Sequence, residues 1–407
     1  MTPSRMRPFQ QTIGLDEARA RLEAAARPID RIERVSLDDA DGRIVARDVI
    51  APFDVPPFAR AAMDGYAVIA EDTVGAARES PKRLVWIETV YTGQMPSVRV
   101  TPGHCIEIAT GAPLPDGADA VVMVEDTDRD DSGFVDVFAP VHAGQHIGRR
   151  GADLTAGRLV LSAGERLNAS RIGALAAIGH AEVDVFARPR VAILSTGNEI
   201  VEPGQALRPG EIYDVNRFTL SAIVAAHGGV PVPIRTAKDT LEELEVGLNA
   251  CLDEDIVVFS GGSSVGERDL VIDILTASGE VIFHGIAVKP GKPTAFGLIN
   301  GKPVFGMPGY PASCLSNGYA LLVPFLRRVA HLPPHQPRTV QVPLARRIVS
   351  APGRYQFFTV RVANGLAEPA FKASGDITSL SRADGYIEIA AEAESVEAGA
   401  VVEVKFF

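Results

Sequence analysis

The chain has 407 residues, 46% of them hydrophobic and 22% charged, and its 40 basic and 51 acidic residues give a formal net charge of -11. This length and composition exclude a single small module and an intrinsically disordered chain, and they predict two to four globular domains. The negative charge disfavours nucleic acid as a partner, because a protein that tracks a polyanionic backbone needs basic side chains to release counterions.

The first residues and the cysteines indicate a protein of a reducing, aqueous compartment. Residues 1–11 include Arg5 and Arg7 but no apolar region as long as that of a signal peptide. No run approaches the ~20 apolar residues of a membrane span. The three cysteines, at positions 105, 251 and 314, form no CxxC pair, so neither a disulfide framework nor a zinc knuckle is indicated. We therefore expect a cytoplasmic protein with no membrane partner.

The first half of the chain is predicted to begin with a helix and to continue as a β-rich domain. Leu15, Ala18 and Leu22 recur at helical spacing, which predicts a helix over residues 16–26. Short β-prone runs then alternate with Pro, Gly and Asp clusters, at residues 84–87, 105–109, 120–124 and 134–138. Residues 141–184 are Gly-rich and surround a predicted helix at 169–178, which ends at Gly179 as a C-cap glycine would.

From residue 190 onward strands and helices alternate. Strands are predicted at 191–194, 230–234, 256–259 and 281–285, and helices at 216–227, 240–252 and 270–277. This alternation is typical of a parallel sheet with helices on both faces. Asn300-Gly301 predicts a hairpin between strands at 294–298 and 304–306, and a helix follows at 313–329.

The fold class expected from these elements is multidomain α/β plus β. Residues 333–337 read as a stiff linker, and the remaining short strands predict a small C-terminal β-barrel or sandwich. The domains that we expect are an N-terminal helix with a connecting region (1–50 and 140–185), a β-rich domain (51–139), a three-layer α/β domain (186–331) and a C-terminal β-barrel (336–407).

Two loops that follow buried strands predict a phosphate-binding site. Ligands of an open α/β sheet bind at the carboxyl ends of its strands. There the strand at 191–194 leads into Ser195, Thr196, Gly197, Asn198 and Glu199, and the strand at 256–259 leads into Ser260, Gly261, Gly262, Ser263 and further small residues. Backbone amides of such loops can approach a phosphate closely, and the hydroxyls add donors. One Gly-rich loop is usually only a turn, but two at one sheet edge favour a phosphate-bearing ligand.

Acidic side chains occur on the same predicted edge. They are Glu199, Asp214, Asp239 and Asp269. Asp214 and Asp239 precede helices and are explained equally well as caps, whereas Glu199 is not. Acids beside a phosphate site are consistent with Mg²⁺, because this hard cation takes oxygen ligands from both sides.

The basic candidates are less uniform. In Val288-Lys289-Pro290-Gly291-Lys292-Pro293 two prolines stiffen a turn that carries Lys289 and Lys292. Lysines fixed in this way are placed to bind an anion. The run from Arg149 to Asp153 is as well explained as a solvated loop, and the elbow at 306–311 as architecture. His142 and His146 have no third partner nearby, so we do not expect a zinc site.

The motifs together resemble one family. They are Ala62-Met63-Asp64-Gly65-Tyr66-Ala67, Thr110-Gly111-Ala112-Pro113, Ser195 to Glu199, Ser260 to Gly266, Lys289 to Pro293 and Pro308-Gly309, and they occur here in that family's order. The chain resembles, over nearly its whole length, the molybdopterin molybdenumtransferase family (MoeA), which includes the gephyrin E domain. Each motif alone is weak, but the joint occurrence of all six is specific.

This resemblance implies an elongated, four-domain homodimer with a molybdopterin-binding α/β domain. The active site is expected between that domain of one subunit and the β-rich domain of the other. The implied reaction is Mg²⁺-dependent insertion of molybdate into adenylylated molybdopterin, which releases AMP and yields molybdenum cofactor. The implied partners are a molybdopterin adenylyltransferase and downstream proteins that handle the cofactor. Molybdate must lose oxo groups as water, so proton donors are needed, and Glu199 and Asp153 are the candidates.

Site residues are carried over by matching motif. The catalytic candidates are Glu199, Asp153, Asp239, Asp269, Lys289 and Lys292, and the metal candidates are Glu199, Asp239 and Asp269. The substrate-binding candidates are Asp64, Thr110, Ser195, Thr196, Gly197, Asn216, Ser260, Gly261, Gly262, Ser263, Pro308, Gly309, Arg354 and Ser374. Asp64 and Thr110 would reach in from the partner subunit, and Arg354 and Ser374 match most loosely.

Two departures from the family pattern and three alternatives remain at this stage. Tyr310 stands where many members have Asn, and Asn198 stands where they have Asp, which removes one carboxylate. The alternatives are an adenylyltransferase, a non-catalytic gephyrin-like scaffold and a paralogue that takes tungstate. The ~230 residues outside the α/β domain disfavour the first, and the retained acids and lysines disfavour the second.

Overall fold

The computed structural model describes residues 12–261 and 270–407, which form two compact units. The first unit contains the segment up to Glu33 together with Phe186–Phe407, and the second unit contains Arg34–Val185. The chain passes from one unit to the other in β1 (Ile32–Ser36) and returns in β12 (Glu182–Phe186), and these two strands pair with each other.

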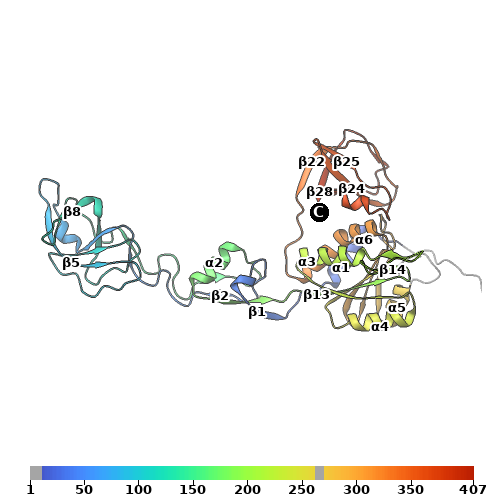
Figure 1. Cartoon of the computed structure of the whole chain (residues 1–407), viewed down its shortest axis with the longest axis horizontal. Coiled ribbons are helices and arrows are strands. Elements are labelled where there is room, and N and C mark those ends of the chain that lie inside the picture. Colours follow the sequence, from blue (N-terminus) through green and yellow to red (C-terminus); the bar gives the residue numbers. More distant parts are fainter. Residues whose placement is uncertain (1–11, 262–269) are drawn as a thin grey trace, which may run out of the picture. The chain divides into compact units, whose positions relative to one another are not determined.

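A six-stranded mixed sheet lies at the centre of the first unit (Figure 1). Its order is β16 (Val230–Ala237), β13 (Arg190–Thr196), β17 (Ile256–Ser260), β21 (Lys302–Met307), β20 (Ala295–Ile299) and β18 (Glu280–His284). The first four strands are parallel, while β20 and β18 are antiparallel additions. Asn300 and Gly301 both have positive φ in the β20–β21 turn, which confirms the predicted hairpin.

Helices cover both faces of this sheet, as the alternation of the sequence predicts (Figure 1). One face carries α1 (Leu15–Ala25), α3 (Asn216–Ala226), α6 (Pro311–Asn317) and α7 (Val323–Val329), and the other carries α4 (Leu241–Cys251) and α5 (Leu270–Ser278). Successive strand residues point to opposite faces, so Ile193 packs with the α1–α3–α7 core and Leu194 packs with the α4–α5 core.

The strand order reverses at β13. From β13 the chain runs through α3 to β16 on one side, and then through α4 to β17 on the other side. In an open α/β sheet, a crevice forms at the carboxyl ends of the strands where the order reverses, and ligands bind there. The fold therefore places a binding crevice at the ends of β13 and β17.

The C-terminal part of the first unit is a second mixed sheet. It consists of β19 (Val288–Lys289), β24 (Tyr355–Ala363), β26 (Gly385–Ile389), β28 (Val401–Phe406) and β22 (Thr339–Pro343), with β25 (Leu366–Pro369) on β24. Leu344 follows β22 and bridges Ala367 of β25, which brings the two ends of the sheet together. The short strand β19 pairs with β24 although it precedes β20 in the chain.

The shorter elements of the first unit complete this description. Parallel strands β14 (Ile200–Val201) and β15 (Ile212–Tyr213) follow β13, the pair β23 (Ile348–Val349) and β27 (Ser395–Val396) lies in the C-terminal part, and α8 (Thr378–Ser381) is a single turn. Within the described residues, no helix is long and apolar enough to cross a membrane.

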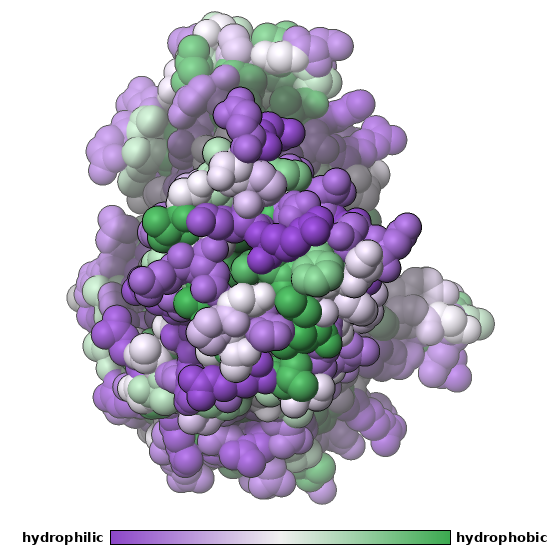
Figure 2. All heavy atoms as spheres, turned by 90° about the vertical axis from the view of Figure 1, so that its left-hand side faces the viewer, coloured by the Kyte–Doolittle hydropathy of each residue, from purple (hydrophilic) through white to green (hydrophobic). Residues whose placement is uncertain are grey.

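The second unit contains the predicted β-rich domain. Its sheet has the order β7 (Ala120–Met123), β4 (Gly65–Val68), β6 (His104–Ile108), β5 (Lys82–Val90), β9 (Phe134–Val137) and β8 (Thr127–Arg129). Short helical turns lie at Ala70–Thr73 and Val124–Asp126. Figure 2 shows one face on which hydrophobic side chains gather among hydrophilic ones, and the exposed large hydrophobic residues of this unit include Met63, Tyr91, Met95, Val98 and Val124.

A separate hydrophobic core holds the rest of the second unit together. This core joins α2 (Ala169–Ala177) to the strand pair of β2 (Val49–Ile50) and β11 (Leu159–Leu161). The turn at Leu37–Asp39 lies beside the core. The pair β3 (Arg60–Ala61) and β10 (Ile147–Gly148) also belongs to this unit. Asn168 caps α2, and the helix ends before Gly179 with φ of 81°, as predicted.

Two elements differ from the sequence-based expectation. The helix predicted at 313–329 is divided by a π-helical stretch at Gly318–Leu322 between α6 and α7, because Pro324 has no N–H for a regular helical hydrogen bond. The N-terminal helix α1 was grouped with the connecting region of residues 1–50 and 140–185, but Leu15, Ala18 and Leu22 pack in the core of the first unit.

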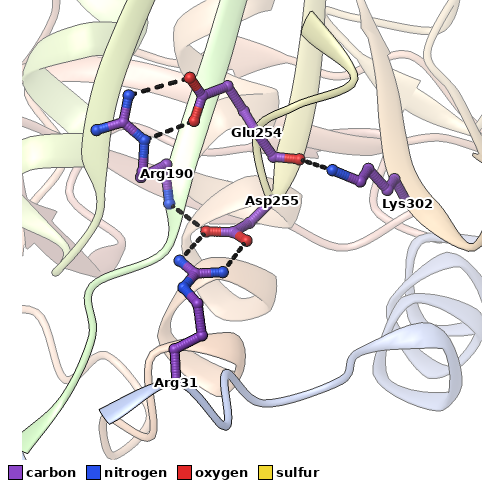
Figure 3. A network of polar contacts seen from close by, with 5 residues as sticks. All are labelled: Arg31, Arg190, Glu254, Asp255 and Lys302. Atoms are coloured by element: carbon purple, nitrogen blue, oxygen red, sulfur yellow. Dashed lines mark hydrogen bonds and ion pairs between the residues drawn. The ribbon is translucent and has the colours of Figure 1, made fainter. Parts of the chain in front are cut away.

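A polar network lies at the amino-terminal ends of the strands of the α/β sheet, away from the crevice at their carboxyl ends (Figure 3). Asp255 accepts hydrogen bonds from both terminal nitrogens of Arg31, at 2.6 and 2.8 Å, and from the backbone N–H of Arg190 at 2.8 Å. Glu254 pairs with the Arg190 guanidinium, and its carbonyl accepts from Lys302 at 2.8 Å. The network ties the segment before β1 to the starts of β13, β17 and β21.

Candidate active site

A cavity of about 1600 Å³ lies at the carboxyl ends of β13, β17 and β21. It is lined by Ser195, Thr196, Glu199, Ile200, Leu207, Ile212, Tyr213, Asp214, Val215, Asn216, Asp239, Thr240, Leu241, Ser260, Gly261, Val288, Lys289, Pro290, Gly291, Lys292, Pro293, Pro308, Gly309, Tyr310, Pro311, Ser313, Arg354, Ser374, Gly375 and Ile377. The cavity therefore coincides with the crevice that the strand order predicts.

The two strand-end loops meet on the cavity floor. Ser195 and Ser260 are register partners of adjacent parallel strands, and both are almost fully buried. The Oγ of Ser195 and the Oγ1 of Thr196 have no hydrogen-bond partner among the described residues. Gly261 has φ of 106°, and a Cβ there would overlap the carbonyl oxygen of Thr196, so only glycine allows the two loops to come this close. Unpartnered buried hydroxyls beside close backbone are suited to bind ligand oxygens.

The start of α3 fixes the neighbouring elbow. Asp214 Oδ1 accepts a hydrogen bond from the N–H of Arg217 at 3.0 Å, so Asp214 caps this helix, and Asn216 is its first residue. Asn216 Nδ2 donates to the carbonyl of Gly309 at 2.8 Å. Its Oδ1 is buried and has no partner in the described part of the chain, so it can accept a hydrogen bond from a ligand.

Three of the predicted acids line the cavity, namely the helix cap Asp214 together with Glu199 and Asp239. Glu199 is exposed, and Asp239 is half-buried after β16. Burial raises the pKa of the Asp239 carboxyl and the negative charge of Glu199 raises it further, while the nearby Thr196 hydroxyl lowers it in part. Asn198 Oδ1 accepts a hydrogen bond from the N–H of Asp239 at 3.3 Å.

Glu199 and Asp239 together suit a divalent cation. The Oδ1 of Asp239 is buried without a partner among the described residues, and a cation between the two carboxylates would relieve their repulsion. Across residues 12–261 and 270–407, no group of three His, Cys, Asp or Glu side chains is placed to hold a metal ion. The third metal candidate, Asp269, lies outside the described residues, as do Gly262 and Ser263.

The Lys289–Pro293 loop forms a second wall, and its backbone is tightly held. The Gly291 carbonyl accepts hydrogen bonds from Asn317 Nδ2 at 2.9 Å and from Thr294 Oγ1 at 2.8 Å. Gly291 has φ of 105°, and a Cβ there would overlap the Asn317 amide. The loop thus presents Lys289 and Lys292 from a defined backbone, which is what binding an anion at a fixed position requires.

The C-terminal sheet contributes to the same cavity. Because β19 pairs with the start of β24, Lys289 and Arg354 are brought to the same side of the cavity. The Ser374 carbonyl accepts a hydrogen bond from the N–H of Ala312 at 3.0 Å, which attaches the Ser374 loop to α6. The two most loosely matched candidates, Arg354 and Ser374, therefore line the predicted site.

Three of the remaining candidates, Asp64, Thr110 and Asp153, belong to the second unit, and Gly197 belongs to the first. Asp64 Oδ1 accepts a hydrogen bond from the N–H of Thr110 at 2.7 Å, so these two residues, which are distant in sequence, are neighbours. Asp153 is exposed, and its N–H donates to the carbonyl of Val55 at 3.0 Å. Gly197 is buried between the cavity residues Thr196 and Glu199, where its φ is 153°.

Sequence reasoning missed an apolar part of the cavity wall. Leu207, Ile212, Tyr213, Leu241 and Ile377 line the cavity and are all exposed, although large apolar residues are usually buried. Tyr310 was noted only as a departure from a pattern. Local sequence carries no signal for these residues, because their exposure depends on how the β14–β15 and C-terminal segments fold over the strand ends.

Comparison with known proteins places these features in one family. Residues 13–179 match the family model "MoeA N-terminal region (domain I and II)", residues 192–328 match "Probable molybdopterin binding domain", and residues 341–407 match "MoeA C-terminal region (domain IV)". The chain is 35% identical to molybdopterin molybdenumtransferase 2 of Mycobacterium tuberculosis, with 95% of this chain and 96% of that protein covered.

Two further relatives extend the likeness. The molybdopterin molybdenumtransferase of Haemophilus influenzae is 31% identical, with 97% of this chain and 98% of that protein covered. The crystal structure of a molybdopterin biosynthesis MoeA protein from Pyrococcus horikoshii superimposes with a TM-score of 0.86 at 40% identity, and covers 97% of this chain and 99% of that one. The likeness therefore extends over all the domains and includes their arrangement along the chain.

Proposed function

The chain belongs to the MoeA family of molybdopterin molybdenumtransferases, transferases of molybdenum cofactor biosynthesis, and we propose that it inserts molybdate into adenylylated molybdopterin with release of AMP. The reaction is proposed to depend on Mg²⁺. The observation that carries the proposal is the composition of one cavity: unpartnered hydroxyls on the floor, carboxylates on one wall, and cations on another.

The substrate's charges match these walls. Its phosphates fit the loops that carry Ser195, Thr196 and Ser260, where hydroxyls and backbone amides are available. Molybdate is a doubly charged oxyanion, and Lys289, Lys292, Arg354 and Ser374 offer cationic and hydroxyl donors on the other side of the cavity. Glu199 and Asp239, together with Asp269, are proposed to hold Mg²⁺, which would neutralise phosphate charge and polarise the bond to be cleaved.

Proton supply is the chemical task left to the protein. When two molybdenum–sulfur bonds form, an oxo group leaves molybdate as water, and each such water requires two protons. The dithiolene thiols and nearby acids can provide them. Glu199 and Asp153 are proposed as these acids.

The active unit is proposed to be a homodimer. Asp64 and Thr110 lie in the second unit, where the hydrogen bond between them orients the Asp64 carboxylate. We propose that this pair from a second copy completes the cavity, and that the product passes to proteins that insert the cofactor into enzymes. A molybdopterin adenylyltransferase would supply the adenylylated substrate.

The proposal is tested by AMP release from adenylylated molybdopterin with Mg²⁺. Wild type and Glu199→Gln are each assayed with molybdate and, separately, with tungstate. We expect AMP release that depends on molybdate and falls at least a hundredfold in the variant, the usual size of a lost acid–base group. Release that requires tungstate would identify a tungstate-specific enzyme. Substrate binding without cleavage by wild type would reject the transferase in favour of the scaffold.

A further inference from the structure

Tyr310 is an aromatic residue of the cavity wall that the proposed chemistry does not use. Its side chain is 67% exposed, although the residues on both sides of it in the chain also line the cavity. Within the described part of the chain it takes part in no aromatic stacking or cation–π contact. An exposed aromatic ring on a concave surface is a common feature of ligand sites.

The backbone beneath this ring is fixed. Pro308 and Pro311 restrict it on either side, and the carbonyl of Gly309 accepts the hydrogen bond from Asn216. The carbonyl of Tyr310 accepts from the N–H of Cys314 at 2.9 Å, at the start of α6. A ring on a rigid backbone loses only two side-chain torsions when a ligand covers it, so binding costs little entropy.

The surroundings of Tyr310 combine apolar and anion-binding groups. The position of a Cβ on Gly375 lies 3.6 Å from Tyr310 Cδ1, an ordinary van der Waals distance, so the edge of the ring lies beside the Ser374 loop. Two residues further on, Ile377 is 46% exposed and lines the same cavity. Arg354 and Ser374 line it as well. This combination fits a planar ring that carries an oxyanion: the ring has an apolar neighbour, and the anion has donors.

We propose that Tyr310 is a specificity-determining residue that stacks on a planar heteroaromatic ring of the substrate. The inference rests on the proposed function, because adenylylated molybdopterin supplies two such rings, the purine and the pterin. Stacking accepts either ring, since each has a π face, and the two are told apart by separate ligands. Tyr310 thus selects ligands that join a heteroaromatic ring to phosphate over phosphate compounds without a ring.

The test compares Tyr310→Leu with Tyr310→Phe in the full-length protein. Leu keeps apolar volume but not the π face, whereas Phe keeps both and lacks only the hydroxyl. Dissociation constants are measured by calorimetry for AMP, molybdopterin and pyrophosphate, the last as a ligand without a ring. Stacking of a base on an aromatic residue changes affinity roughly fivefold to hundredfold. We expect Tyr310→Leu to raise the dissociation constant for AMP or for molybdopterin at least fivefold. The dissociation constants of Tyr310→Phe, and those of both variants for pyrophosphate, should stay within threefold of wild type.

Each other outcome has a definite meaning. If Tyr310→Leu binds both ring-bearing ligands as tightly as Tyr310→Phe does, or if its affinity for pyrophosphate falls in parallel, Tyr310 does not stack and the inference is rejected. Wild type that binds neither AMP nor molybdopterin also rejects it. Molybdate-dependent AMP release by wild type is measured alongside. If wild type releases AMP but the affinities of Tyr310→Leu are unchanged, only the inference is rejected. If the affinities change as expected but wild type releases no AMP, only the proposed reaction is rejected.

Discussion

At the scale of single residues, Asp239 is kept in an unfavourable place for the sake of the site. Burial and the charge of Glu199 both raise its pKa, so its ionised form costs stability in the folded protein. Functional sites often carry such a cost, and removing the charge then stabilises the fold while it impairs activity.

We therefore predict that Asp239→Asn raises the midpoint of thermal unfolding at pH 7 and lowers the rate of AMP release. The gain in unfolding free energy should stay below about 1 kcal/mol, because Asp239 is only half-buried and solvent screens its charge in part. The cost to wild type is absent below the unfolded pKa of about 3.9 and develops as pH rises through the raised folded pKa. The two proteins should thus converge near pH 4. A variant less stable than wild type at pH 7 would contradict the argument.

The reactivity of each cysteine depends on the burial of its own thiol. Burial raises the pKa of Cys105, Cys251 and Cys314 to about 12 in each case, so all three are protonated at pH 8. The thiolate is the reactive form, and none of the three is exposed. We predict that an aromatic disulfide reagent at pH 8 modifies no cysteine of the native protein within minutes, and modifies three after unfolding in guanidinium. Rapid modification of the native protein would show that one of these cores opens easily.

At the scale of elements, the loop at 288–293 shows how one glycine sets the position of two lysines. Gly291 combines a positive φ with close contact to the Asn317 amide, and Asn317 in turn bonds Thr294 Oγ1 at 2.6 Å. A Cβ at position 291 would break this arrangement and move Lys289 and Lys292 with the loop.

We predict that Gly291→Ala destabilises the protein by about 2 to 4 kcal/mol and weakens binding of oxyanions, as measured by thermal unfolding and by calorimetry with molybdate. Gly301→Ala is the matched control. Gly301 also has a positive φ, 78°, but no atom lies within 4 Å of the place its Cβ would take. It should cost only about 1 kcal/mol and leave oxyanion binding unchanged. Equal effects of the two substitutions would assign the whole cost to backbone conformation.

The elements also show what sequence can predict. Strand β17 was found because its buried residues form one apolar run, and its end correctly indicated the cavity floor at Ser260. The pairing of β19 with β24 could not be found, because its register partners Val288 and Tyr355 are 67 residues apart and the pairing depends on the packing of the C-terminal sheet. Likewise, the hydrogen bond of Asn216 with the carbonyl of Gly309 could not be found, because it joins segments that only the folded sheet brings together.

At the scale of the whole molecule, the Asp255 network anchors the segment that leads out of the first unit. Burial by itself would raise the pKa of Asp255, but the hydrogen bonds from Arg31 and Arg190 lower it below its usual value. A lowered folded pKa adds stability that is present above the unfolded pKa and lost as pH falls through the folded one.

We predict that Asp255→Asn lowers the free energy of unfolding by about 1 to 3 kcal/mol at pH 7, because Arg31 loses its bidentate partner. The difference from wild type should shrink as the pH falls below about 4. Denaturant unfolding at several pH values measures it. Asp384→Asn offers a comparison, since its carboxylate accepts a single backbone hydrogen bond, from Val362, and it should cost less. A pH-independent difference would mean that packing, rather than charge, gives Asp255 its effect.

In the proposed dimer, each active site takes residues from two copies of the chain. The proposed dimer places the Asp64–Thr110 pair of one copy against the α/β cavity of the other, so damage to Asp64 and damage to Glu199 fall on different subunits of one site. We predict that Asp64→Ala and Glu199→Gln are each inactive alone, and that subunits exchanged in equal amounts recover about a quarter of the wild-type rate. Half of the dimers are then mixed, and in each of these one of the two sites carries both substitutions while the other carries neither. Mixtures that remain inactive, although light scattering shows mixed dimers of twice 43.2 kDa, would place all these residues within one chain's own site.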